Sequence, residues 1–140
     1  MKPDPKYQDR VARLLGMEVL DVGPGQAKVR LQISEKFYNA ADMVHGGVLF
    51  TLADYAFALA ANSGEDIGIA ISATIHYIQP AKKGFLYAEC REITHNRRMG
   101  TYTATVTDDD GQTMCVFQGL AYYKSPTPEA RSKRQDARGK

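Results

Sequence analysis

The fold of this chain is decided by residues 46–61, which read GGVLFTLADYAFALAA. Apolar and small residues occupy nearly every position, so the segment predicts a helix that is apolar all round, and such helices are normally buried. Asp54 stands in the middle of the segment, which contains no basic residue. Burying an unpaired carboxylate costs a large part of the stability margin of a small domain. Asp54 is therefore the first candidate for a catalytic residue.

Composition excludes several classes of protein. A chain of 140 residues with a hydrophobic fraction of 44% fits one globular domain with a single core. The longest apolar stretch, residues 48–61, is shorter than the roughly 20 residues that a membrane span requires. Residues 1–5 are not followed by the apolar core of a signal peptide. Cys90 and Cys115 lie in strand-like runs, so we expect buried thiols rather than a disulfide, and a cytoplasmic location.

The basic charge of the chain is concentrated at its C-terminal end. Of the net charge of +2, residues 124–140 contribute +4 through six Lys or Arg and two Asp or Glu, and the rest contributes −2. Residues 125–140 contain almost no apolar side chains, so we expect a disordered basic tail after a single domain over residues 1–124. Such a tail can contact nucleic acid or a membrane. A solubilising role is the simpler interpretation, and we expect neither partner.

Strand patterns surround the predicted helix. A short amphipathic helix, with Asp4 as its N-cap and Pro5 in its first turn, is expected to present Tyr7, Val11, Leu14 and Leu15 on one face. Alternating apolar residues then predict six strands. They lie at residues 17–22, 26–33, 68–79, 85–94, 99–107 and 112–124.

One long helix among six strands favours an α+β fold. The simplest arrangement is a mainly antiparallel sheet wrapped around the central helix, which buries the helix on several sides. A single sheet covers only part of a helix surface. The remaining apolar face requires another subunit, so we expect an obligate oligomer.

The start of the helix carries the second chemical signal, His45-Gly46-Gly47. A helix N-terminus presents unpaired N–H groups and partial positive charge, and glycines there permit close approach of a ligand. Such donors can stabilise the oxyanion that develops at an attacked carbonyl. Asp54 lies eight residues after Gly46, about 12 Å along the axis, which is too far for both to serve one carbonyl. Two antiparallel helices related by a two-fold axis would instead bring Gly46 of one subunit to Asp54 of the other.

The chain resembles a known family in these motifs. The segments Asn39, His45-Gly46-Gly47, Leu52-Ala53-Asp54 and Tyr77-Ile78-Gln79-Pro80-Ala81 are similar to those of the hotdog-fold acyl-CoA thioesterases. The similarity is closest to the phenylacetic acid degradation (PaaI-like) group of the 4-hydroxybenzoyl-CoA thioesterase superfamily, and it covers residues 16–123. The resemblance implies a six-stranded sheet around one helix, dimers that usually form tetramers, and acyl-CoA hydrolysis without a metal or other cofactor.

The resemblance also assigns roles to residues. Asp54 matches the catalytic carboxylate, Gly46 the glycine whose N–H binds the thioester carbonyl, and Asn39 and His45 the polar residues that flank the substrate or hold the loop. Some relatives place a Ser or Thr on the next strand to orient water, and Ser72 is the position that we assign here. The other substrate-binding candidates are Gly47, the pocket residues Tyr38, Met43, Phe50 and Phe57, and Arg97 and Arg98 for the phosphates of coenzyme A.

Simpler interpretations of these residues stay open. His45 can act as a helix cap instead of contacting substrate, and Arg97 and Arg98 can be solvated turn charges. His76, His95 and the two cysteines do not have metal-ligand spacing, so we expect no metal site.

The leading hypothesis is an acyl-CoA thioesterase in which Asp54 acts as nucleophile or as general base. By resemblance, an aryl-acetyl or medium-chain acyl group is the expected substrate. The alternatives are a non-catalytic acyl-CoA-binding module and an enoyl-CoA hydratase or dehydratase of the same fold.

Overall fold

The computed structural model describes residues 9–124. The proposed tail at residues 125–140 and the proposed N-cap Asp4 lie outside this range. In chain order the elements are α1 (Arg10–Leu15), β1 (Glu18–Gly23), β2 (Gln26–Gln32), the 3-10 turn η1 (Glu35–Phe37), α2 (Gly46–Ala61), β3 (Gly68–Tyr77), β4 (Phe85–His95), β5 (Met99–Thr107) and β6 (Thr113–Tyr123).

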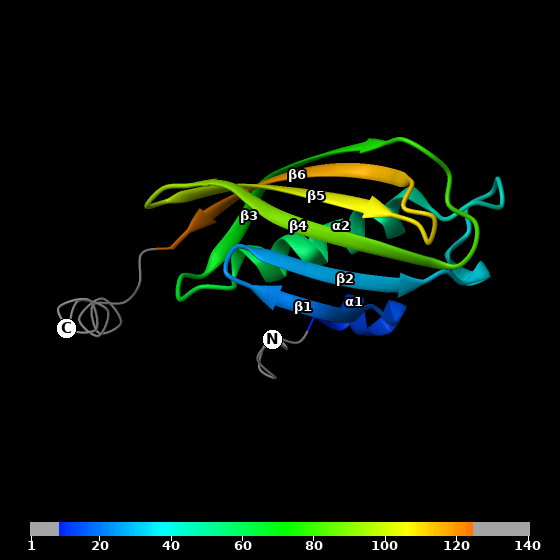
Figure 1. Ribbon diagram of the computed structural model, residues 1–140, viewed down its shortest axis with the longest axis horizontal. Helices are drawn as coiled ribbons and strands as arrows, with labels where there is room; N and C mark the ends of the chain where they lie inside the picture. The colour runs from blue at the N-terminus through cyan, green and yellow to red at the C-terminus, as the bar shows by residue number, and fades with distance from the viewer. Residues whose placement is uncertain (1–8, 125–140) are drawn as a thin grey trace.

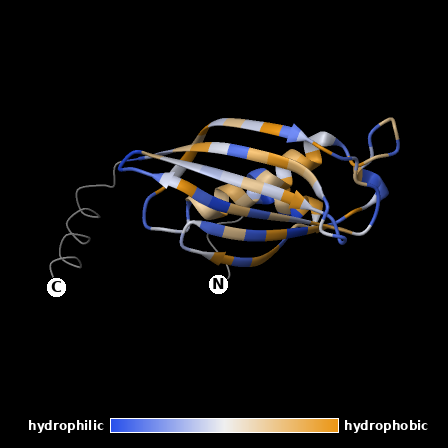
Figure 2. Ribbon diagram, turned by 45° about the horizontal axis from the view of Figure 1, so that its top comes forward, coloured by the Kyte–Doolittle hydropathy of each residue, from blue (hydrophilic) through white to orange (hydrophobic). Residues whose placement is uncertain are grey.

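The six strands form one antiparallel sheet in the order β1-β2-β4-β5-β6-β3. The sheet curves around α2, and α1 lies beside β1 at one edge (Figure 1). This is the hotdog arrangement that the sequence predicted, with a short helix before the first strand. Figure 2 shows that α2 is apolar over most of its length, while the strands alternate between apolar and polar residues. The apolar face of the sheet can therefore cover the apolar helix.

The core lies between α2 and the concave face of the sheet. Leu52, Ala53 and Ala56 of α2 have no exposed surface, and Phe57 is 1% exposed. Burying each large apolar side chain contributes about 1.5–3 kcal/mol. Helix and sheet approach closely at Gly119 of β6, where a Cβ atom would lie 2.8–2.9 Å from three atoms of the Phe57 ring. A glycine is therefore required at residue 119 for the helix to sit this close to the sheet.

Helix α1 starts later than the sequence predicted. Its N-cap is Asp9, whose side chain accepts a hydrogen bond from the N–H of Ala12 at 2.9 Å. The helix is only six residues long, and it turns the small Ala12 toward the core. Val11 and Leu14, which were expected on the buried face, are exposed.

Strand β3 forms one edge of the sheet and contains a bulge that changes which residues face α2. Ala70 pairs with Ala121 but Ser72 pairs with Leu120, so one extra residue is inserted between them. Opposed residues point to the same face. Because the neighbouring Gly119 faces the helix, Ser72 points with Leu120 to the convex face. Ser72 therefore points away from α2 of its own protomer, on the opposite face from Ala70, and its role in the site stays a prediction.

The two cysteines are confirmed as buried free thiols on β4 and β6. Burial raises the pKa of Cys90 to about 12 and that of Cys115 to about 11. Neither described helix has the length and apolar character needed to cross a membrane.

The contact between Gly119 and Phe57 gives the first prediction. Replacing Gly119 with Ala inserts a methyl group into the Phe57 ring and should lower the free energy of unfolding by about 1–3 kcal/mol, the usual cost of overpacking a core. Gly64 is the matched control, because a Cβ atom there would have no neighbour within 4 Å. Urea unfolding of Gly64→Ala should stay within about 0.5 kcal/mol of the parent. Equal values for the two variants would contradict the close packing at Gly119.

Candidate active site

The loop that leads into α2 is held together by Asn39. Tyr38 and Val44 form an isolated antiparallel bridge across it. Within it, the side-chain oxygen of Asn39 accepts hydrogen bonds from the N–H groups of Ala41 at 2.9 Å and Met43 at 3.2 Å. Asn39 therefore fixes the place where α2 begins. Its amide NH2 group has no acceptor within residues 9–124, so this group remains available to a ligand.

His45 is the N-cap of α2. Its Nδ1 accepts a hydrogen bond from the N–H of Gly47 at 2.8 Å. This bond requires an unprotonated Nδ1, so the ring proton is assigned to Nε2. The structure thus supports the capping interpretation of His45. The side chain is also exposed, and a contact between its Nε2–H and a substrate stays a prediction.

The first turn of α2 leaves one N–H group open. The N–H of Gly47 is bound by the His45 ring, and the N–H groups of Val48 and Leu49 donate to the His45 carbonyl at 2.9 and 3.3 Å. In the described part of the chain, the N–H of Gly46 has no hydrogen-bond acceptor. Since the positive end of the helix dipole lies here, Gly46 is the donor in this turn that can meet an oxyanion.

Both glycines of the first turn lie against side chains of the same protomer. A Cβ atom on Gly46 would lie 3.2 Å from Cε1 and Cζ of Tyr77 and 3.3 Å from its hydroxyl oxygen, and one on Gly47 would lie 3.0 Å from Nδ1 of His45. The Tyr77 hydroxyl also donates to the Gly46 carbonyl at 3.2 Å. Tyr77 stands in the quoted motif, but its contact with Gly46 could not be predicted from the sequence, because only the register of β3 shows which way its side chain points.

Asp54 lies on the side of α2 that the sheet leaves open. We define the open stripe as Gly47, Thr51, Asp54 and Ala58, residues on one helical face that are partly or fully exposed while their neighbours toward the sheet are buried. Asp54 is therefore half-buried in the protomer and not fully buried as the sequence suggested. None of the ion pairs within residues 9–124 includes it. Burial, and then the negative charge of Asp9, raise the pKa of Asp54, which makes its carboxylate a stronger base.

One protomer does not bring Gly46 and Asp54 to the same point. They lie at the start and in the middle of one helix, about 12 Å apart at the rise of an α-helix. A carbonyl must lie about 3 Å from both the attacking group and the oxyanion donor. Within one protomer, Gly46 and Asp54 therefore cannot serve the same carbonyl.

The four candidates for lining the pocket differ in how much surface they expose. Tyr38, Met43 and Phe50 are half-buried near the start of α2, and the ring of Phe50 meets that of Phe117 edge to face at 5.3 Å. Phe57 instead lies in the core, against the rings of Tyr102 and Phe117 at 5.5 and 5.6 Å. Its ring has almost no free surface within the protomer, so the pocket role of Phe57 stays a prediction.

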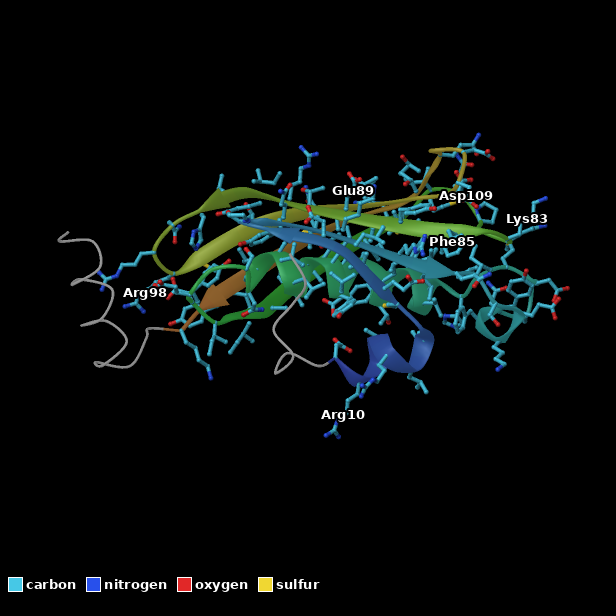
Figure 3. The ribbon with its side chains drawn as sticks, turned by 60° about the horizontal axis from the view of Figure 1, so that its bottom comes forward. Arg10, Lys83, Phe85, Glu89, Arg98 and Asp109 are labelled. Carbon is cyan, nitrogen blue, oxygen red and sulfur yellow. The ribbon has the colours of Figure 1, made fainter. Side chains whose placement is uncertain are left out.

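Arg97 and Arg98 lie at the opposite end of the sheet from the start of α2. They stand in the turn between β4 and β5, where the Arg98 guanidinium donates to the hydroxyl of Tyr122 at 3.4 Å. Figure 3 shows Arg98 at one end of the molecule and Lys83, near the loop that precedes α2, at the other. The protomer does not bring Arg97 or Arg98 to Gly46. Among residues 9–124, no three His, Cys, Asp or Glu side chains are placed to hold a metal ion.

Comparison with known proteins adds a family to this geometry. The model of the Thioesterase superfamily matches residues 41–115. A putative esterase of Archaeoglobus fulgidus is 35% identical over 115 residues, which are 81% of this chain and 75% of that protein. The acyl-coenzyme A thioesterase PaaI of Escherichia coli is 29% identical over 115 residues, 81% of this chain and 82% of that protein.

Solved structures agree with this result. The structure of E. coli PaaI, from the phenylacetic acid degradation operon, superimposes with a TM-score of 0.83 at 28% identity and covers 87% of this chain and 89% of that one. A mutant of the phenylacetic acid degradation protein PaaI from Thermus thermophilus gives a TM-score of 0.78 at 32% identity, covering 81% of this chain and 98% of that one.

The raised pKa of Asp54 predicts a pH-dependent stability difference. Between the ordinary value of 3.8 and the raised value in the folded protein, the folded state binds more protons, so stability falls as the pH rises through this window. Asp54→Asn removes this loss. The variant should be more stable than the parent at pH 7, and the difference should shrink toward about pH 3.5. Urea unfolding at both pH values measures it, and a variant that is less stable at pH 7 would show that the carboxylate is stabilising.

Proposed function

Because the chain belongs to the thioesterase superfamily, whose members include thioester hydrolases, we propose that it hydrolyses an acyl-CoA to the free acid and coenzyme A. The observation that carries this proposal is the open N–H of Gly46 at the start of α2, combined with Asp54, which has no ion-pair partner among the described residues, on the open stripe of the same helix. The first can stabilise an oxyanion. The second can activate water or attack the carbonyl itself.

The catalytic unit in this proposal is a homodimer formed along β3. This edge strand and its flanks expose large apolar side chains, with Ile71 at 53% and Ile67 at 65% of their surface. An exposed apolar edge invites aggregation unless another strand covers it. A second copy placed antiparallel along β3 would cover it, and the two-fold axis would direct Gly46 of one protomer toward Asp54 of the partner. Two such dimers would form the tetramer that the family resemblance implies.

The proposed chemistry needs only the chain's own groups and water. The thioester carbonyl accepts the hydrogen bond of Gly46. On one route Asp54 of the partner subunit removes a proton from water, whose oxygen adds to the carbonyl carbon. On the other, an Asp54 oxygen adds first and water then opens the resulting anhydride. On both routes the C–S bond breaks and coenzyme A leaves as a thiolate that takes up a proton, so coenzyme A is part of the substrate and no further cofactor is invoked.

The substrate class follows from relatives and from the residues near the start of α2. E. coli PaaI comes from the phenylacetic acid degradation operon, which supports an aryl-acetyl group as the acyl part of the substrate. A medium-chain acyl group is the second candidate. Tyr38, Met43 and Phe50 would line the acyl pocket, with Asn39 and His45 beside the thioester. Arg97 and Arg98 would reach the phosphates of coenzyme A only from another protomer, because they lie far from their own Gly46. We place the enzyme in the cytoplasm, which the two free cysteines support.

Loss of the carboxylate tests the proposed function directly. Asp54→Asn keeps the shape of the side chain and should lower the turnover number for phenylacetyl-CoA or hexanoyl-CoA by about 10²–10⁴-fold, the usual contribution of a general base. Release of the free thiol measures it, with circular dichroism as the control for folding. Tight binding of intact acyl-CoA without release by the parent would favour a binding module. Addition of water to an enoyl-CoA would favour a hydratase.

Removal of the Gly46 donor tests the oxyanion site. Gly46→Pro deletes the N–H at the first helical position, where proline is tolerated, and the extended backbone of His45 is compatible with a following proline. Gly46→Ala is the matched control, since it adds a Cβ atom but keeps the N–H. Turnover of Gly46→Pro should be about 10²–10³-fold below the parent, as for loss of an oxyanion donor, and well below that of Gly46→Ala.

The same variants test whether each site is shared between protomers. A mixed dimer of a Gly46→Pro chain and an Asp54→Asn chain contains one site with both wild-type groups. Co-expression of the two inactive chains should therefore restore up to half the parent activity per mixed dimer. No recovery in isolated mixed dimers would place both groups of a site in one chain and overturn the shared arrangement.

A further inference from the structure

Tyr77 joins the edge strand to the start of the catalytic helix. It is the last residue of β3 and pairs with Cys115, a fully buried residue on the concave face of β6, so its side chain points toward α2. Its hydroxyl donates to the Gly46 carbonyl at 3.2 Å, and its ring occupies the space in which a Gly46 side chain would lie. Yet 53% of Tyr77 remains exposed. The ring therefore rests on Gly46 with one part and borders open space with the rest.

The contact with Tyr77 explains why residue 46 is a glycine. The three atoms closest to a Cβ atom on Gly46 all belong to the outer end of Tyr77. Contacts of 3.2–3.3 Å are tighter than ordinary van der Waals contacts between carbon atoms. A side chain at residue 46 must therefore displace the tyrosine ring or rotate the first turn of α2, and either movement changes the direction of the Gly46 N–H.

We propose that Tyr77 is a positioning residue of the thioesterase site, whose ring and hydroxyl hold Gly46 so that its N–H points at the thioester carbonyl. This role rests on the proposed function. The Asn39 loop and the His45 cap fix where α2 begins. Tyr77 fixes the orientation of its first residue from the opposite side. Because Tyr77 ends the strand along which the proposed dimer forms, pairing of two β3 strands would also settle the position of each oxyanion donor.

The direct test compares two tyrosines that each lose one hydroxyl hydrogen bond of the same length. Tyr77→Phe removes the hydroxyl that binds Gly46. Tyr87→Phe removes a hydroxyl that donates to Asp109 at the same distance of 3.2 Å, on the convex face away from α2. With phenylacetyl-CoA, Tyr77→Phe should lower kcat about tenfold with little change in KM, since a misplaced donor weakens the transition state more than substrate binding. Tyr87→Phe should leave both constants unchanged. Equal behaviour of the two variants would overturn the role of Tyr77.

A double-mutant cycle tests the steric part of the role. Tyr77→Leu removes the three atoms that a Cβ atom on Gly46 would meet. Gly46→Ala and Tyr77→Leu should each lower kcat, but the double variant should be no worse than Tyr77→Leu alone, because the clash no longer exists. If the two losses multiply in the double variant, residue 46 is a glycine because the ligand needs the space there, and the steric role of Tyr77 is overturned.

A measurement without substrate separates this role from the proposed function. The amide resonance of Gly46 should shift in the NMR spectrum of Tyr77→Phe and stay in place in Tyr87→Phe. An unshifted Gly46 resonance would contradict the positioning role even in an active enzyme. A parent protein that hydrolyses no acyl-CoA would overturn the proposed function, and the role of Tyr77 in it, whatever the spectrum shows. An active parent in which Tyr77→Phe equals Tyr87→Phe would overturn the role of Tyr77 alone.

Discussion

One constraint governs this molecule: a six-stranded sheet can surround an apolar helix on several sides but cannot close around it. The side chains of α2 that face the sheet are buried, and Phe57 is packed so closely that residue 119 must be a glycine. The face that remains is the open stripe from Gly47 to Ala58. The half-buried Asp54 lies there because the fold supplies no strand to cover it. The uncovered face of α2 and the half-buried carboxylate are thus two results of the same incomplete wrapping.

The start of α2 shows how a short segment can fix one hydrogen-bond donor. His45 uses its side chain for Gly47 and its carbonyl for Val48 and Leu49, so it satisfies the neighbouring donors and leaves that of Gly46. The side chain of Thr51, one turn further, donates to the Gly47 carbonyl at 2.8 Å and secures the same turn. A donor held in this way needs little reorganisation when charge develops on a carbonyl oxygen, which is the condition for effective electrostatic catalysis.

Most of the architecture could be predicted from the sequence, because it depends on patterns that are local. The apolar run of residues 46–61 gave the central helix with its bounds, and the alternation in the other segments gave six strands. What could not be predicted depends on single insertions and on contacts between distant residues. The bulge in β3 adds one residue between Ala70 and Ser72, and this puts the two residues on opposite faces of the sheet. The core position of Phe57 and the contact of Tyr77 with Gly46 join residues from different elements, so no periodicity within one element contains them. The six-residue α1 was misjudged for a similar reason, since the small Ala12 and not the larger Leu14 fits against the core.

The buried thiols have a consequence of their own. Cys90 and Cys115 are almost completely removed from solvent, and their raised pKa keeps them protonated and therefore unreactive at neutral pH. A disulfide reagent that detects liberated coenzyme A will not react with the buried thiols of the folded chain. The background signal of that assay therefore depends on how much of the protein is unfolded. Any slow signal from the protein itself reports the opening of β4 or β6 away from the helix. The chain thus carries two built-in probes of how often its core comes apart, one on each of two strands that flank β5.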